Sequence, residues 1–261
     1  MDQLSRRNVL SSSFALAVGA LPLAACSAAP ASRSKLSKVY VFGTIHRRHL
    51  ASEAYSLAVF EAAVRAAQPD VILTEIPPDR VETAILTFQR TGTVDELRTN
   101  VFPEYTDVVI PLSKPQGWRV IGCAAWTPDI ARNRRAALKA IEQDPARREQ
   151  WAEHRAASRA FAKAVRGRSD DPRFVHTPDF DRLVAASREP YARHFDDDLG
   201  AGGWTHINSA HNALINAALD SLSGQGLRVA ITFGTAHKYK ILESLSARSD
   251  VILENTAALF G

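Results

Sequence analysis

The chain has 261 residues, of which 46% are hydrophobic and 23% are charged, and it contains only 2 Cys. This composition suits one globular domain with a large core, and it excludes a disulfide scaffold, a coiled coil, a collagen-like rod and a wholly disordered chain. The net charge of +4 lies within the first 38 residues, which carry five basic residues and one acidic residue (5 − 1 = 4), so residues 39–261 sum to zero. A neutral body has no field that attracts phosphate backbones, and we expect no nucleic-acid partner.

The N-terminal residues follow the pattern of a bacterial export signal. Two adjacent arginines precede an apolar stretch, Phe14 to Ala25, as in a signal of the twin-arginine type. The stretch ends in Leu-Ala-Ala-Cys, which resembles a lipobox, so we expect residues 1–25 to be removed and Cys26 to be lipidated; the alternative is an ordinary signal peptide in which Cys26 has no role. Residues 26–37 are rich in Ser, Ala and Pro, as in a flexible tether. These features predict a protein on the periplasmic side of a bacterial membrane, attached to that membrane only through its lipid anchor.

Beyond the tether, the sequence alternates between strands and helices. Continuous apolar runs predict strands at residues 38–43, 71–76, 118–123, 227–233 and 250–254. Apolar residues at helical spacing predict helices at residues 52–67, 77–90 and 236–247, the first of them capped by Ser52. Continuous apolar strands require burial on both faces, which a parallel sheet covered by helices provides. We therefore predict a single α/β domain, residues 38–261, with a mostly parallel central sheet flanked by helices.

Residues 128–199 form a long Arg- and Ala-rich segment that predicts a helical insertion in this domain. Such an insertion can serve as a lid, as a small helical subdomain or as a dimerisation arm that makes the protein a homo-oligomer. The run Asp196-Asp197-Asp198 precedes a glycine-rich stretch and predicts a loop. The second cysteine, Cys123, ends a predicted strand with no basic neighbour, which favours a small buried side chain over a nucleophile.

One pentapeptide pattern occurs twice, each time between a predicted strand and a predicted helix. Residues 42–46 read Phe-Gly-Thr-Ile-His, and residues 233–237 read Phe-Gly-Thr-Ala-His. A bare Gly-x-x-His is expected about 0.4 times in a chain of this composition, whereas the form that includes Thr is expected roughly 0.02 times. We expect the glycines, Gly43 and Gly234, to allow a sharp turn and a close approach, and the threonines, Thr44 and Thr235, to cap the helices that follow.

The two motifs place their histidines where an α/β sheet binds ligands. The carboxyl ends of parallel strands lie at one edge of the sheet, so we expect His46 and His237 to meet there with Glu75, which ends the strand at 71–76. Two imidazoles and a carboxylate can hold a divalent metal ion with open positions for water or substrate. They can equally form a metal-free site in which one histidine is the general base and Glu75 fixes its tautomer. These three residues are the candidate catalytic residues and the candidate metal ligands.

Three further polar residues are candidates for a supporting role. His49 follows His46 by three residues and is a candidate extra ligand. Asn208 and His211 lie on the helix predicted at residues 205–222, from which either side chain can support the site. His211 shares its helix face with apolar residues, which favours a buried, hydrogen-bonded histidine.

The paired Gly-x-x-His motifs, together with a Glu at the end of the next strand, resemble the TraB/GumN/Tiki group, which is related to erythromycin-esterase-like and ChaN-like proteins. The resemblance spans residues 38–254 and implies an α/β fold with a site built from His46, Glu75 and His237. It implies metal-dependent peptidase activity as in Tiki-like members, or histidine-based ester hydrolysis as in esterase-like members. ChaN-like members are instead lipoproteins that bind haem or iron.

Three kinds of function follow from these observations. The first is a hydrolase of a small-molecule or peptide substrate, either metal-dependent or metal-free. The second is a haem- or metal-binding lipoprotein without catalysis. The third is a protein that binds a peptide on the same fold and does not cleave it.

Overall fold

A computed structural model describes residues 35–261. The predicted export signal, the lipidation of Cys26 and most of the predicted tether lie outside the described residues. At the end of the tether, Lys35 already forms a β-bridge with Gln225, and the first strand begins at the buried Ser37, so the domain starts before residue 38. No helix within residues 35–261 is both long enough and apolar enough to cross a membrane.

The described residues form a five-stranded sheet whose paired strands all run parallel. Its strands are β1 (Ser37–Thr44), β2 (Val71–Thr74), β3 (Arg119–Gly122), β4 (Arg228–Gly234) and β5 (Val251–Leu253). Their order across the sheet is β3-β2-β4-β1-β5, which places the three strands that precede the candidate residues side by side at its centre. This confirms the predicted α/β fold class.

Helices cover both faces of the sheet, and the strand residues alternate between the two faces. Tyr40, Phe42 and Ile72 face a core formed with α1 (Leu57–Ala67), α2 (Pro78–Thr91) and α3 (Ile110–Gln116). Their sequence neighbours Val39, Val41 and Leu73 face a second core formed with α8 (Trp204–Leu222) and α9 (Thr235–Leu245). Both faces of the central strands β1, β2 and β4 are therefore buried, which is why these strands read as continuous apolar runs, whereas the edge strand β5 is partly exposed.

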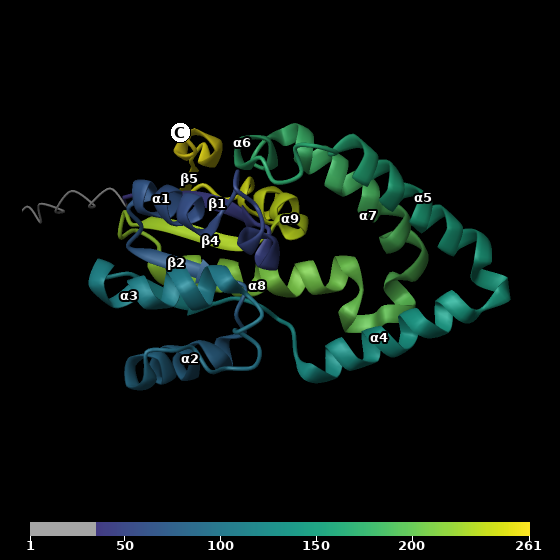
Figure 1. The fold of residues 1–261 in the computed structure, drawn as a ribbon, viewed down its shortest axis with the longest axis horizontal. Helices are drawn as coiled ribbons and strands as arrows, with labels where there is room; N and C mark the ends of the chain where they lie inside the picture. Colours follow the sequence, from purple (N-terminus) through teal and green to yellow (C-terminus); the bar gives the residue numbers. More distant parts are fainter. Residues whose placement is uncertain (1–34) are drawn as a thin grey trace, which may run out of the picture. The chain divides into compact units, whose positions relative to one another are not determined.

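Residues 128–199 are helical, as predicted. They form α4 (Pro128–Gln143), α5 (Arg148–Ala164), α6 (Pro172–Val175) and α7 (Pro178–Leu199), of which α4, α5 and α7 lie beyond the carboxyl edge of the sheet (Figure 1). Ile141, Tyr191 and Phe195 of the insertion form a small core with Trp204 of α8, the helix at Trp204–Leu222, and Phe180 and Val184 of α7 join the core of the domain. The insertion is thus packed onto the domain at the edge where the candidate residues lie.

The structure corrects two predictions about helix ends. Ser56, not Ser52, caps α1: its side chain accepts the Val59 N–H, whereas Ser52 accepts the Tyr55 N–H and donates to Asp170. The acidic run at 196–198 is part of α7 and not a loop. Its first residue, Asp196, has a structural role there: its carboxylate accepts the first backbone N–H groups of α8.

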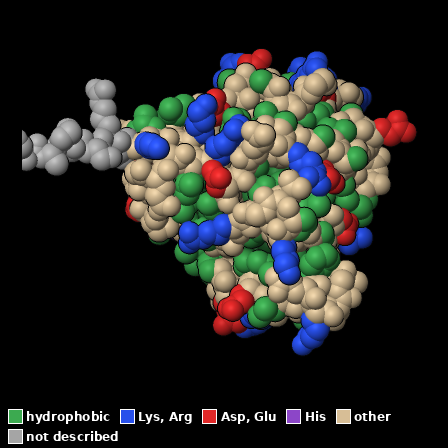
Figure 2. Space-filling model, turned by 90° about the vertical axis from the view of Figure 1, so that its left-hand side faces the viewer, with side chains coloured by type: hydrophobic (Ala, Val, Ile, Leu, Met, Phe, Trp, Pro, Cys, Tyr) green, Lys and Arg blue, Asp and Glu red, His purple; other side chains and the backbone are tan. Residues whose placement is uncertain are grey.

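The opposite end of the domain carries a different surface. Figure 2 shows this face, where Lys and Arg side chains are interspersed with Asp and Glu and do not gather into a patch of one sign. The two motif histidines and Glu75 instead come together at the carboxyl edge of the sheet.

Candidate functional site

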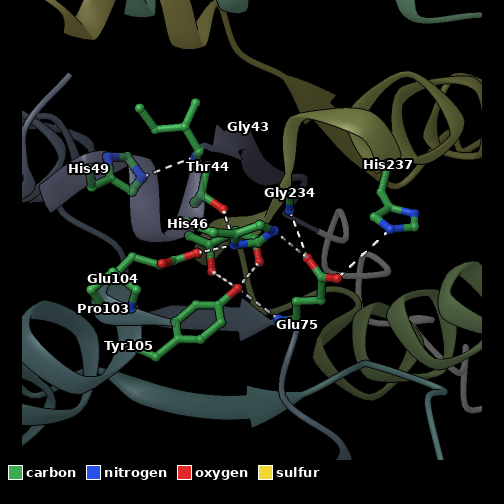
Figure 3. A network of polar contacts seen from close by, with 12 residues as sticks. Gly43, Thr44, His46, His49, Glu75, Pro103, Glu104, Tyr105, Gly234 and His237 are labelled. Carbon is green, nitrogen blue, oxygen red and sulfur yellow. Dashed lines mark hydrogen bonds and ion pairs between the residues drawn. The ribbon is translucent and has the colours of Figure 1, made fainter. Parts of the chain in front are cut away.

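His46, Glu75 and His237 meet at the carboxyl edge of the sheet, as the topology predicts (Figure 3). They follow β1, β2 and β4, which are neighbours in the sheet. Glu75 lies between the two histidines: its Oε2 is 3.8 Å from Nε2 of His46, and its Oε1 is 3.8 Å from Nε2 of His237. Residues that lie far apart in the sequence are thus neighbours in the folded domain.

Glu75 is fixed in this central position by the backbone. Its Oε2 accepts the N–H of Gly234 at 2.7 Å, and its own N–H donates to the hydroxyl of Tyr105 at 2.9 Å. The Tyr105 hydroxyl in turn donates to the carbonyl of Thr232 at 2.6 Å, so the tyrosine links β2 to β4. Burial raises the pKa of Glu75, an effect that the His46 charge and the Gly234 N–H only partly offset.

His46 has an unusual backbone. Its φ is +50°, in the left-handed region that non-glycine residues seldom adopt, and it begins a short 3-10 helix, His46–Leu50. This conformation directs the imidazole back over the sheet edge. The side chain keeps 33% of its surface exposed, against 7% for Glu75 and 11% for His237, so His46 is the member of the site that is open to solvent. Backbone strain of this kind is typical of functional sites.

Glu104, which sequence analysis did not single out, is the direct partner of His46. The Nδ1–H of His46 donates to Oε1 of Glu104 at 2.7 Å, and the Glu104 side chain is fully buried. Burial alone raises the pKa of Glu104, but the hydrogen bond and charge of His46 outweigh it, so the Glu104 pKa falls. Burial lowers the pKa of His46, but the hydrogen bond to Glu104 and the charges of Glu75 and Glu104 together outweigh burial and raise that pKa. Glu104 therefore holds His46 in one orientation and favours its protonated form.

The position of Glu104 explains why sequence analysis missed it. It begins a single stretch of π-helix, Glu104–Val109, that follows an irregular loop and carries Tyr105 into the core. The one signal in the sequence was a carboxylate followed by Tyr105, shortly before the apolar stretch 108–110. Its second oxygen, Oε2, is buried and has no hydrogen-bond partner among the described residues.

His237 is held as a neutral imidazole. Its Nδ1–H donates to Oδ1 of Asn208 at 2.8 Å, which directs Nε2 toward Glu75. Its ring stacks on Trp204, with ring centres 5.0 Å apart. Burial lowers the pKa of His237 well below its ordinary value, and the charges of His211 and Arg188 lower it further. Asn208 thus occupies the supporting position predicted for it.

Of the other two candidate supporting residues, only His211 keeps a nitrogen, Nε2, without a hydrogen-bond partner among the described residues. His49 is buried with both nitrogens engaged: Nε2 accepts the N–H of Ile45, and Nδ1–H donates to the carbonyl of Tyr55. The prediction of His49 as an extra ligand is therefore wrong. His211 accepts the N–H of Ala125 through Nδ1 and packs its ring 5.1 Å from that of His237, and burial lowers its pKa to about 4.

The motif glycines have the predicted role, and the motif threonines do not. A Cβ on Gly234 would overlap Nε2 of His46, so only glycine lets the histidine lie across the end of β4. A Cβ on Gly43 would meet Lys238 and Thr235 at 3.2 Å, a tight contact. Neither Thr44 nor Thr235 caps a helix: the residue before α9 is Gly234, with no side-chain cap, and Thr44 instead places its hydroxyl 3.3 Å from Nδ1 of His46.

The side chains of His46, Glu75 and His237 are of the kinds that bind a divalent metal ion, but they are not spaced closely enough to hold one. Both Nε2 atoms face one carboxylate, while both Nδ1–H groups are held by buried acceptors, an arrangement typical of metal-binding histidines. Nevertheless, no group of three or more His, Cys, Asp or Glu side chains within residues 35–261 is arranged closely enough to hold an ion. Haem binding, the alternative that ChaN-like members suggest, stays a prediction.

Cys123 has the buried role that its sequence context predicts. It is fully buried and unpaired among the described residues, and burial raises the pKa of its thiol to about 12. A thiol with so high a pKa is a poor nucleophile.

Comparison of the chain with protein-family models, curated proteins and solved structures finds no match.

Proposed function

We propose that this protein is a hydrolase that uses water to cleave an ester or peptide bond at the carboxyl edge of its sheet. The observation that carries the proposal is the pair formed by His46 and Glu104, which leaves Nε2 of His46 facing Glu75 without a hydrogen bond among the described residues, on a side chain that keeps 33% of its surface exposed. A histidine oriented by a buried carboxylate is the standard device for moving a proton during acyl transfer. The resemblance of the paired motifs to the TraB/GumN/Tiki group supports the same reaction class.

In this proposal His46 acts as the general base. Nε2 of neutral His46 takes a proton from a water molecule as that water attacks the substrate carbonyl, and Glu104 stabilises the imidazolium that forms. The raised pKa of Glu75 allows that residue to hold a proton for the leaving group. His237 stays neutral, and its role is to position Glu75 from the side opposite His46.

The same donors give the proposal a metal-dependent form. Nε2 of His46, the Glu75 carboxylate and Nε2 of His237 are the atoms that would hold a divalent ion, with Glu104 and Asn208 orienting the two rings. Such an ion would lower the pKa of a bound water and polarise the substrate carbonyl. In either form, the chain itself supplies the orientation of both histidines and the position of Glu75.

The test is a hydrolysis screen of the purified full-length protein against esters and peptides, with EDTA and with added Zn²⁺, Mn²⁺ or Mg²⁺. We expect His46→Ala to lower kcat/KM by at least about 100-fold. His206→Ala is the matched control, because His206 is an exposed histidine on α8 that hydrogen-bonds only the carbonyl of Gly200 among the described residues. If EDTA abolishes the activity, the hydrolase is metal-dependent. Activity that survives His46→Ala unchanged, or peptide binding without cleavage, would overturn the proposal.

A further inference from the structure

Arg188 carries a positive charge that no acidic side chain in the described part of the chain balances. It lies on α7, its Nε is buried without a hydrogen-bond partner among residues 35–261, and its guanidinium carbon lies 4.6 Å from the centre of the Trp204 ring. The nearest acidic residues of α7 have other partners: Glu189 pairs with Arg193, and Asp181 pairs with Lys238. Burial lowers the pKa of Arg188.

A second arginine lies close to the first. Arg134 of α4 is half-buried, forms no ion pair among the described residues and lies 5.8 Å from the centre of the Tyr191 ring. The hydroxyl of Tyr191 is also buried without a partner in the described chain. The charges of Arg188 and Arg134 both lower the pKa of His237, so both arginines act on the site described above.

Arg188 also lines a cavity of about 220 Å³ that adjoins this site. Three hydroxyl side chains line it with Arg188, from Ser158, Ser187 and Thr235. Thr235 follows Gly234, whose N–H holds Glu75, and the cavity-lining Ala236 precedes His237. A ligand in this cavity would therefore lie beside the second motif and against Arg188, which also lines a neighbouring cavity together with Trp204.

The half-buried guanidinium of Arg188, which has no acidic partner among the described residues, indicates what such a ligand would be. Partial removal of an ion from water without a partner has a cost, and the protein recovers little of that cost from the Trp204 ring alone. An anion in the cavity would supply the missing charge. The planar guanidinium matches the oxygens of a carboxylate or a phosphate, to which it donates two parallel hydrogen bonds.

We propose that Arg188, with Arg134 nearby, binds a carboxylate or phosphate group of the molecule on which the site acts. The identity of that molecule as a hydrolysed substrate rests on the proposed function, whereas the binding of the anionic group does not. The insertion then supplies specificity, because α4 and α7 bring the two arginines to the second motif.

The first experiment measures anion binding without any reaction. The full-length protein is titrated with inorganic phosphate and, separately, with succinate, and binding is followed by calorimetry and by tryptophan fluorescence, since Trp204 lies against Arg188. We expect Arg188→Gln to weaken binding at least about 30-fold and Arg188→Lys to weaken it less. Arg193→Gln, on the same helix but paired with Glu153 and Glu189, should bind as the wild type does. The anion that binds more tightly distinguishes phosphate from carboxylate.

Two results would overturn the inference. In one, the wild type binds neither anion. In the other, Arg188→Gln binds as well as the wild type but melts at a lower temperature, which is the result expected if Arg188 only packs against Trp204.

A second experiment separates this inference from the proposed function. The kinetics of a neutral ester, 4-nitrophenyl acetate, are compared with those of its anionic counterpart, 4-nitrophenyl succinate. We expect wild type to prefer the anionic ester and Arg188→Gln to lose that preference through a higher KM. If neither ester is cleaved and anion binding still depends on Arg188, the subsite stands and the proposed function loses support. If both esters are cleaved equally well by both proteins, the subsite is wrong and the hydrolase stands.

Discussion

Nδ1 of His46 and Oε1 of Glu104 lie 2.7 Å apart, although 58 positions separate the two residues in the chain. The pair joins the turn after β1 to the π-helix that precedes α3. Because Glu104 holds Nδ1, the pair fixes the imidazole with its other nitrogen, Nε2, facing Glu75.

Replacing Glu104 with Gln should therefore change the pH dependence of hydrolysis. Glu104 raises the pKa of His46, so removing its charge lowers that pKa. A general base must be neutral, so a lower His46 pKa should move the acid limb of the rate profile to lower pH. We also expect kcat to fall about 100-fold. The measurement is kcat against pH from 5 to 9. Glu96→Gln is the control, since Glu96 is a buried glutamate that binds Thr99 and the Arg98 N–H instead. An unshifted limb would show that His46 is not the base.

Gly234→Ala should abolish activity by displacing His46. The added methyl group overlaps Nε2 of His46, and the imidazole cannot move aside without losing its alignment with Glu104. Gly43→Ala is the graded comparison, because there the neighbours at 3.2 Å include the flexible Lys238 side chain. We expect Gly234→Ala to lower kcat/KM far more than Gly43→Ala at a similar melting temperature. Equal effects of the two substitutions would contradict the close approach at Gly234.

Asn208→Ala should release the ring of His237. The Asn208 carbonyl oxygen fixes the proton on Nδ1, and its loss leaves the ring free to change tautomer. We expect activity to fall about 10- to 100-fold, with a changed histidine tautomer in ¹H–¹⁵N NMR spectra. Asn212→Ala, one turn further along α8, is the matched control, since Asn212 donates to the carbonyl of Lys240 and not to a histidine. A spectrum that keeps the wild-type tautomer would refute the role of Asn208.

Lys238→Met should destabilise the protein by leaving a charge unpaired inside it. Lys238 is almost fully buried, and its ammonium donates to Asp181 of α7 at 2.5 Å. Removing one partner of a buried pair costs about 3–5 kcal/mol, whereas the double change Lys238→Met with Asp181→Leu should restore most of the loss. The free energy of unfolding in urea measures both. The exposed pair of Lys240 with Glu243 is the comparison, and Lys240→Met should cost under about 1 kcal/mol.

His176 should make the protein less stable in acid. Burial lowers its pKa to about 3, and both its nitrogens bind backbone, Nε2 accepting the Gly43 N–H and Nδ1–H donating to Pro172. Between the pKa of an exposed histidine, about 6.5, and this lower value, the unfolded chain binds a proton that the folded chain does not. The free energy of unfolding should therefore fall as the pH falls, by about 1.4 kcal/mol per pH unit from this residue. His176→Gln should flatten the decline in urea unfolding between pH 7 and pH 5. An equally steep decline in that variant would contradict the assignment to His176.

The sequence predicted most of the sheet because its signals are local. The strands that precede His46 and His237 have bounds within a residue or two of those expected, since each is an apolar run closed by the glycine of a motif. The convergence of His46, Glu75 and His237 also follows from local patterns, because parallel strands end at one edge whatever their order. Ser52 was assigned as the wrong cap because Ser52 and Ser56 have equally plausible contexts until the backbone between them is known.

The sequence by itself therefore determined the fold class, the helical insertion and the edge at which the three motif residues lie, because hydrophobic periodicity and strand ends are read from neighbouring residues. Only the tertiary structure decided what surrounds those residues. The bond from Glu104 to His46, the left-handed backbone of His46 and the unpaired charge of Arg188 all depend on which distant segments pack together. Burial and the charged partners that packing brings together set the pKa values of these groups, and both are properties of the packed chain and not of its sequence pattern.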